Sequence, residues 1–491
     1  MMIILTAILY FAAIFVIGRI TSRHATNSSF YSGDHRSPWY VVAFGMIGAS
    51  ISGISFVSVP GMVVHSDMTY LQTCLGFIVG YFVVAFVLLP IYYRLDSPSI
   101  YSYLGKWLGR RSYITGASFF LLSKITGAAL RFYVVCMILH RFVVQPVLGT
   151  DNPMSFAFTA ITMVALIWLY TRRGGIKTLV WTDSLQTFCL FAALVAIIIN
   201  VIGALDMSAG EAISAIAADK HSRIFVMDDW ISRQNFWKQF ISGIFIVIVM
   251  TGLDQDMMQK NLTCRSLHDA RKDMCTYGMA FVPANLLLMA LGILLLMLAD
   301  KQGAVLPTSA DDILPMFAAT GVLGNGVVIL FTIGIVAAAF SSADSAMTSL
   351  TTSFCVDIMR RPHDERLRRR AHLAMAVLFV VFILLFKTFN STSVIDAVYI
   401  LCSYTYGPLL GLFSYAIYTE IRNKKSDNKK QCSPVVVCDK AAPYVAVISP
   451  ILCYAIDTLS SSLWGYKFGY ELLMLNGMLT FFGLMLFDRK A

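Results

Sequence analysis

Long apolar windows separated by short polar loops fill this sequence almost from end to end. A window of about 20 apolar residues can cross a lipid bilayer as a helix, and backbone polar groups in lipid must be hydrogen-bonded within the segment. The windows fall near 2–20, 39–63, 69–93, 113–139, 153–171, 178–203, 236–258, 273–299, 324–357, 371–389, 394–419, 443–460 and 468–487. The sequence therefore predicts an all-α polytopic membrane protein with thirteen transmembrane helices.

The charged residues agree with this interpretation. Only 13% of the 491 residues are charged, whereas a soluble protein has about 25%. The net charge of +10 could suggest nucleic-acid binding, but Lys and Arg concentrate in alternate loops, chiefly 360–370 and 422–440. That is the positive-inside pattern, so we expect no nucleic-acid partner. It predicts a multi-pass protein of the plasma membrane, the inner membrane in a bacterium, with its N-terminus outside and its C-terminus cytoplasmic.

Two predicted helices are interrupted by glycine and polar residues. Window 39–63 contains GMIGASISGISFVSVPG, and window 236–258 ends in MTGLDQDMM. Such residues loosen a spanning helix and free carbonyls to face a cavity, although glycine can also serve only close helix packing. The two windows are the second and the seventh, so each could open one of two inverted repeats. We therefore expect an extra helix at 1–20, repeats at 39–205 and 236–420, and two extra helices at 443–487.

Several charges lie within the apolar windows, where each costs roughly 2.5–3.5 kcal/mol on insertion scales. Lys124 and Arg131 are seven residues apart and share a helix face. The planar guanidinium of Arg131 suits bidentate capture of the carboxylate of an anionic solute. It could instead meet only Asp344 or a backbone carbonyl. Asp254 and Asp256 stand at the end of their window, and we expect them to be surface or gate charges facing the cytoplasm.

The segment 337–355, AAAFSSADSAMTSLTTSFC, combines an intramembrane carboxylate with many hydroxyls. Ser341, Asp344 and Ser345 lie at i, i+3 and i+4 and present oxygen atoms on one helix face. Hard oxygen ligands suit a small cation. Hydroxyls can instead bond to their own helix or join two helices, which explains the serines well and Asp344 poorly. Asp183 is a further interior carboxylate, near the cytoplasmic side.

Three of these segments resemble the sodium/solute symporter family, with some likeness to its sialic acid transporters. They are GASISGISFVSVPG, GGIKTLVWTDSLQT and AAAFSSADSAMTSLTTSFCVDI, and the resemblance covers nearly the whole chain. It implies a five-plus-five inverted-repeat core of the leucine-transporter type, with one extra N-terminal and two extra C-terminal helices. It further implies sodium-driven import of a small solute by alternating access, and no enzymatic activity.

The resemblance also implies positions for sodium. A first site would use the backbone carbonyls of Gly48, Ile51 and Ala338 and the hydroxyls of Ser341 and Ser342. A second site, which some members have, matches Asp183, Ser341, Asp344 and Ser345. Members often have a hydroxyl in place of Asp344. The added charge could tighten the second site or replace it with a Lys124–Asp344 ion pair.

For the solute, the resemblance points to side chains that contact substrate in sialic-acid-transporting members: Ser50, Ser52, Ser55, Gln72 and Arg131. Arg131 favours sialic acid or another small carboxylate. A proton-coupled carrier using Asp183 and Asp344, or a sodium-coupled importer of sugars or neutral solutes, are the alternatives. The oligomeric state is not predicted.

Energetics would make a second sodium ion useful for an anionic solute. At roughly 100 mV and a tenfold sodium ratio, one ion supplies about 3.7 kcal/mol, of which the anion loses about 2.3. The remaining 1.4 or so supports about tenfold accumulation, whereas two ions leave about 5.1 kcal/mol, several thousandfold.

Overall fold

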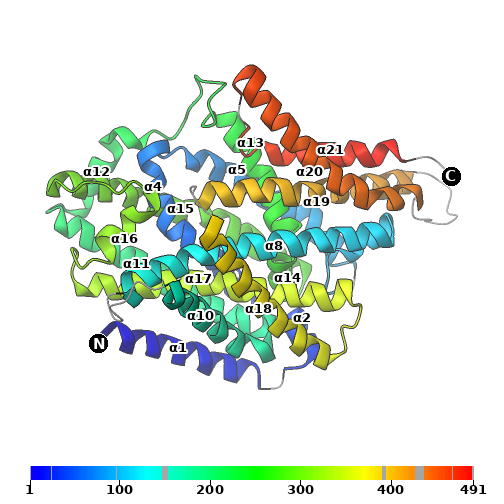
Figure 1. Cartoon of the computed structure of the whole chain (residues 1–491), viewed down its shortest axis with the longest axis horizontal. Helices are drawn as coiled ribbons and strands as arrows, with labels where there is room; N and C mark the ends of the chain where they lie inside the picture. The colour runs from blue at the N-terminus through cyan, green and yellow to red at the C-terminus, as the bar shows by residue number, and fades with distance from the viewer. Residues whose placement is uncertain are drawn as a thin grey trace.

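The computed structural model describes residues 2–23, 25–95, 97–145, 153–389, 394–425, 436–466 and 468–488. These residues form a helical bundle (Figure 1) whose one β-type contact is an isolated bridge between Ser37 and Cys264. The helices are α1 (Met2–Thr21), α2 (Asn27–Ser32), α3 (Trp39–Ser50), α4 (Gly53–Ser66), α5 (Tyr70–Val83), α6 (Leu89–Tyr92), α7 (Ser102–Trp107), α8 (Arg110–Leu139), α10 (Pro153–Gly174), α11 (Ile176–Ala204), α12 (Ala209–Ala218), α13 (Phe236–Val247), α14 (Gln255–Asn261), α15 (Leu267–Gln302), α16 (Ile313–Ala318), α17 (Asn325–Ser353), α18 (Glu365–Phe389), α19 (Val394–Lys425), α20 (Val436–Trp464) and α21 (Leu472–Leu486).

The predicted all-α membrane architecture is confirmed in its coarse form. Within the described residues, nine helices are long and apolar enough to cross a membrane, and eleven if each bent pair counts as one span. Ile8–Thr21 of α1 and all of α21 are apolar but shorter. Length and composition thus support eleven spans, and the count of thirteen stays a prediction.

Both interrupted helices are broken where the sequence predicts. Between α3 and α4 the chain bends by 58°, with Ile51 and Ser52 outside helical structure. After α13 a π-helical turn, Ile248–Gly252, leads to the short helix α14 across a bend of 70°. A π turn adds a residue to the helical ladder and often marks a functional position.

The first broken helix packs tightly against α11. A Cβ at Gly48 would lie 2.0 Å from Thr187 Oγ1, so any larger residue would push the two helices apart. The end of α3 is thereby held beside Asp183, which lies on α11.

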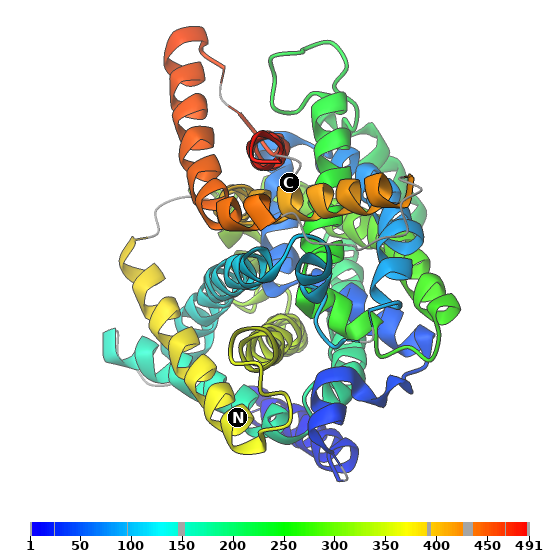
Figure 2. The same cartoon turned by 90° about the vertical axis from the view of Figure 1, so that its right-hand side faces the viewer.

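Helix α17, which carries the serine-rich segment, runs through the interior of the bundle. Figure 2 looks along it and shows other helices around it. It packs against α11, α8 and α4, and nearly every residue from Phe331 to Ser353 is buried. Its polar side chains must therefore find partners inside the protein.

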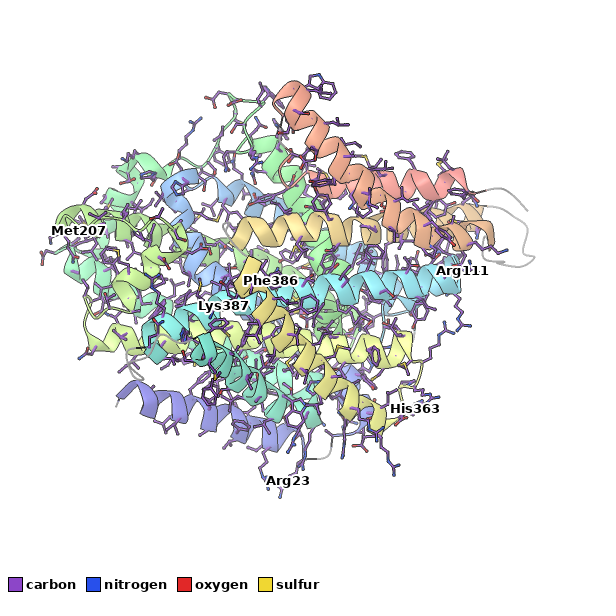
Figure 3. The ribbon with its side chains drawn as sticks, viewed as in Figure 1. Arg23, Arg111, Met207, His363, Phe386 and Lys387 are labelled. Atoms are coloured by element: carbon purple, nitrogen blue, oxygen red, sulfur yellow. The ribbon has the colours of Figure 1, made fainter. Side chains whose placement is uncertain are left out.

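The helices predicted as extra lie at the edges. Helix α1 runs along the lower edge in Figure 1, and α20 and α21 lie at the upper edge. The loops also separate by end (Figure 3): Arg111 and His363, from segments predicted to face the cytoplasm, lie at one end, and Met207, from a segment predicted to face outward, lies at the other.

Candidate functional site

A cavity of about 120 Å³ lies between the two broken helices. Its walls come from the break between α3 and α4, from α5, α8 and α15, from the π turn and α14, and from α17 and α19. A cavity at the meeting point of two interrupted helices is where transporters with inverted repeats hold their solute. The lining combines apolar side chains with many polar groups: Ser50, Ser52, Ser55, Ser123, Lys124, Arg131, Thr251, Asp254, Asp256, Ser342, and the tyrosines Tyr70, Tyr81, Tyr277 and Tyr406.

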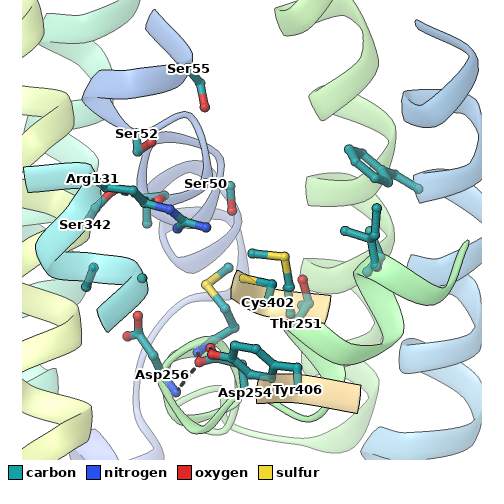
Figure 4. A pocket seen from close by; sticks show the side chains of 18 of the residues that line it. Ser50, Ser52, Ser55, Arg131, Thr251, Asp254, Asp256, Ser342, Cys402 and Tyr406 are labelled. Atoms are coloured by element: carbon teal, nitrogen blue, oxygen red, sulfur yellow. Dashed lines mark hydrogen bonds between the residues drawn. The ribbon is translucent and has the colours of Figure 1, made fainter. Parts of the chain in front are cut away.

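The two cations of α8 share one face, as their spacing predicts. Lys124 and Arg131 both line the cavity, and Gly127 between them leaves open space where a side chain would project. In Figure 4 the guanidinium of Arg131 extends from α8 toward Ser50 on the broken helix. Arg131 is partly buried, and no carboxylate of the described residues forms an ion pair with it.

Lys124 pairs with Asp254 and Asp256 and not with Asp344. Its ammonium lies 2.7 Å from Asp256 Oδ2 and 3.1 Å from Asp254 Oδ2, which corrects the alternative that it pairs with Asp344. Of the expectation that Asp254 and Asp256 are surface or gate charges, the surface alternative is wrong, because they are only 2% and 5% exposed. The gate alternative stays a prediction. The bend before α14 turns this helix end into the interior, where each carboxylate needs a cation.

Asp254 is further held by two neighbours. Its Oδ1 accepts a hydrogen bond from the backbone N–H of Asp256 at 2.8 Å and so caps α14. Its Oδ2 accepts one from the hydroxyl of Tyr406 at 2.6 Å. The floor of the cavity is thus a polar cluster of residues from α8, α14 and α19.

Of the two hydroxyls expected for the first sodium site, the structure brings that of Ser342 to the first break. Ser342 Oγ donates to the carbonyl of Ala49 at 3.0 Å and lies 3.3 Å from the carbonyl of Ala338. Gly48 and Ile51, whose carbonyls were predicted as ligands, lie near Ala49: Gly48 precedes it in α3, and Ile51 is the C-cap residue of that helix. Ser341 points instead toward α11, where its hydroxyl donates to Asp183 Oδ1 at 3.1 Å.

The residues expected for the second sodium site meet a lysine that the sequence analysis missed. Lys260 of α14 lies 2.7 Å from Asp183 Oδ2. Asp344 is fully buried and accepts a hydrogen bond from Tyr170 at 2.5 Å. Ser345 Oγ, also buried, has no hydrogen-bond partner among the described residues. The signal for Lys260 was present in the sequence: it follows Asp256 by four residues, one helical turn, directly after the interrupted segment.

Four of the five residues expected to contact solute line the cavity: Ser50, Ser52, Ser55 and Arg131. Ser50 Oγ is also hydrogen-bonded to the hydroxyl of Tyr277. Gln72 is outside the lining. It is fully buried, its Oε1 accepts from Val226 N at 3.1 Å, and its amide donates to the carbonyl of Gln234 at 2.9 Å. Its observed role is to hold the 205–238 connection against α5.

Residues 30–426 match the sodium:solute symporter family. Among characterised proteins, the sodium/sialic acid symporter SiaT of Proteus mirabilis is 24% identical over 440 residues, which are 85% of this chain and 84% of that protein. The sodium/sialic acid symporter NanT of Aliivibrio fischeri is 24% identical over 429 residues, 85% of this chain and 83% of that protein.

The fold resembles that of a solved transporter. A structure of the substrate-bound, outward-open state of a Na+-coupled sialic acid symporter superposes with a TM-score of 0.82 at 20% identity and covers 99% of this chain and 97% of that chain. At this identity the match concerns the fold.

Proposed function

This chain belongs to the sodium:solute symporter family, and from that premise we propose that it imports a small anionic solute, sialic acid or another carboxylate, together with sodium. It is a sodium-coupled transporter and not an enzyme.

The observation that carries the proposal is the difference between the two cations of the cavity. Lys124 is neutralised by Asp254 and Asp256, whereas no described carboxylate pairs with Arg131. A partly buried guanidinium facing a cavity favours a charge-assisted, bidentate hydrogen bond to a carboxylate. Ser50, Ser52 and Ser55, on the opposite wall, supply hydroxyls for the polar atoms of the solute.

We place the first sodium ion at the break between α3 and α4, with Ser341, Ser342 and the carbonyls of Gly48, Ile51 and Ala338 as its ligands. This is supported by the reach of Ser342 from α17 to the carbonyl of Ala49. A cation here would bridge the broken helix and α17 directly beside the solute residue Ser50. Sodium binding would thereby order the solute wall and favour solute binding, and solute binding would favour closure and inward release.

The domain division stays as predicted, with an extra helix at 1–20, repeats at 39–205 and 236–420, and extra helices at 443–487. It is supported by the two breaks, five predicted helices apart, and by the edge positions of α1, α20 and α21. The placement of Arg111 and His363 opposite Met207 is consistent with the proposed orientation, in which the N-terminus is outside, the C-terminus is cytoplasmic and the spans lie in the plasma membrane.

Uptake into proteoliposomes tests the proposal. The full-length protein should take up radiolabelled carboxylates, sialic acid and small monocarboxylates among them, when sodium is outside, and should lose that uptake when choline replaces sodium at constant pH. Neutral sugars and amides of matched size should neither enter nor compete. Uptake of neutral solutes alone would overturn the assignment of an anionic substrate, and uptake that persists in choline would contradict the role of sodium.

A further inference from the structure

The side chain of Lys260 lies in the interior between α14, α11 and α17. It is only 2% exposed, and its ammonium lies 2.7 Å from Asp183 Oδ2, whose side chain is 1% exposed. A buried lysine is costly unless it is paired. Besides Asp183, the carboxylates whose charge acts on it are Asp256 and Asp344. Lys260 is therefore the cation that pairs with Asp183 and whose charge also acts on Asp344.

These carboxylates include both acids of the expected second sodium site, and one of them is fully engaged. Asp183 holds Ser341 on one oxygen and Lys260 on the other. Asp344 uses one oxygen for Tyr170. The other oxygen of Asp344 and the hydroxyl of Ser345 are buried without a hydrogen-bond partner in the described part of the chain. The positive charge of the Lys260 ammonium acts on Asp344 as well as on Asp183.

We propose that the ammonium group of Lys260 occupies the second cation position, so that this symporter moves its solute with one sodium ion. The inference rests on the proposed function for sodium coupling at the first break. An ammonium is a compact point charge with three donors and no acceptor, so it satisfies carboxylate and hydroxyl oxygens as a sodium ion does. A sodium ion at Asp183 would face a second positive charge at short range in a poorly screened interior, which disfavours its binding.

The lysine differs from an ion in that it remains attached to α14. Two hollows reach this segment: Asp256 and Met257 line the solute cavity, while Gln259 and the C-cap residue Leu262 line a separate hollow of about 610 Å³. The ion pair between Lys260 and Asp183 ties α14 to α11. This pair must break before α14 can move away from α11, whereas a bound sodium ion could leave with the solute.

One sodium ion and one monoanion carry no net charge, so transport is electroneutral and depends on the sodium ratio alone. A tenfold sodium gradient then supports roughly tenfold accumulation, and the membrane potential adds nothing.

Equilibrium binding of ²²Na⁺ to the purified full-length protein, in choline buffer without solute, tests the proposal. We expect one ion per wild-type protein. Lys260→Met should bind two, because it leaves Asp183 without its cation and removes the positive charge that acts on Asp344. The double variant Lys260→Met/Asp183→Asn should return to one. Sodium should also raise the thermal stability of Lys260→Met more than that of the wild type, because a second ion binds to the folded state alone.

Two ions in the wild type, or a single ion in folded Lys260→Met, would overturn the proposal. If Lys260→Met cannot be obtained folded even in high sodium, the wild-type count still decides between one and two. A count of one combined with uptake of neutral solutes alone would contradict the proposed substrate class and leave the role of Lys260 standing. A count of two sodium ions combined with uptake of carboxylates would support the proposed substrate class and contradict the role of Lys260.

Discussion

The ammonium of Lys124 lies 2.7 Å from a carboxylate oxygen of Asp256 and 3.1 Å from one of Asp254. This contact joins the continuous helix α8 to the first turn of α14, beneath the solute cavity. Lys260, one turn further along α14, makes the second contact of this helix, with Asp183 on α11. The short helix α14 is thus fixed at both ends by buried ion pairs.

Removing Lys124 should therefore destabilise the protein more than removing one of its partners. In Lys124→Met, two buried carboxylates lose their cation, and breaking a buried pair in this way costs about 3–5 kcal/mol. In Asp256→Asn, Lys124 keeps Asp254, so we expect a smaller loss, on the order of 1–3 kcal/mol. Thermal unfolding of the purified variants in detergent measures the difference. Equal losses would mean that Asp254 does not hold Lys124 by itself.

Ser342→Ala should weaken sodium binding while leaving the fold intact. The substitution removes the hydroxyl that reaches from α17 to the carbonyl of Ala49. If this ligand contributes roughly 1.4 kcal/mol to the free energy of sodium binding, its loss lowers the sodium affinity tenfold. Ser349→Ala is the matched control. It lies on the same helix, is buried, and its hydroxyl donates only to the carbonyl of Ala346 within that helix. Sodium titration of thermal stability compares the two, and an equal effect in both would argue against a sodium site at the break.

The parts of the site that could be predicted are those encoded locally. The breaks near Ile51 and Leu253 follow from glycine and polar residues within apolar windows. The shared face of Lys124 and Arg131 follows from their seven-residue spacing along one helix. In each case the helical geometry of a single segment fixes the result.

What the sequence could not reveal depends on how distant segments pack. In the sequence, Asp254 and Asp256 stand at the end of an apolar window, where surface charges are expected. The bend before α14 instead turns them into the interior. The role of Lys260 depends on its ion pair with Asp183, which lies far away in the chain. Gln72 follows the broken helix closely in sequence, yet its amide faces the 205–238 connection and not the cavity.

Arg131 variants should separate solute binding from sodium binding. Arg131→Lys keeps the charge but loses the planar pair of donors, and Arg131→Met loses both. A hydrogen bond to a charged group contributes about 1.5–3 kcal/mol, so we expect the KM for the carboxylate to rise about tenfold or more in Arg131→Met, and less in Arg131→Lys. The stabilisation by sodium without solute should be unchanged in both. An unaltered KM in Arg131→Met would show that the guanidinium does not contact the solute.

Gly127 offers a steric test of the cavity that leaves its charges in place. It lies on α8 between Lys124 and Arg131, and a Cβ there would meet no atom within 4 Å. Gly127→Ala should therefore fold well and gain about 0.8–1 kcal/mol from helix propensity, with most uptake retained. Gly127→Phe should also fold, because the ring can enter the cavity, but it should abolish carboxylate uptake by occupying the space of the solute.

The matched control is Gly48→Ala, which adds a smaller side chain than Gly127→Phe but at a position where α3 packs tightly against α11. Its Cβ would lie 2.0 Å from Thr187 Oγ1, and overpacking of this kind costs about 1–3 kcal/mol. We expect it to lower the melting temperature and the sodium affinity together, because it displaces the end of α3. Gly127→Phe should instead lose uptake with the sodium-dependent stabilisation intact. Normal uptake by Gly127→Phe would place the solute path away from the face of α8 that bears Lys124 and Arg131.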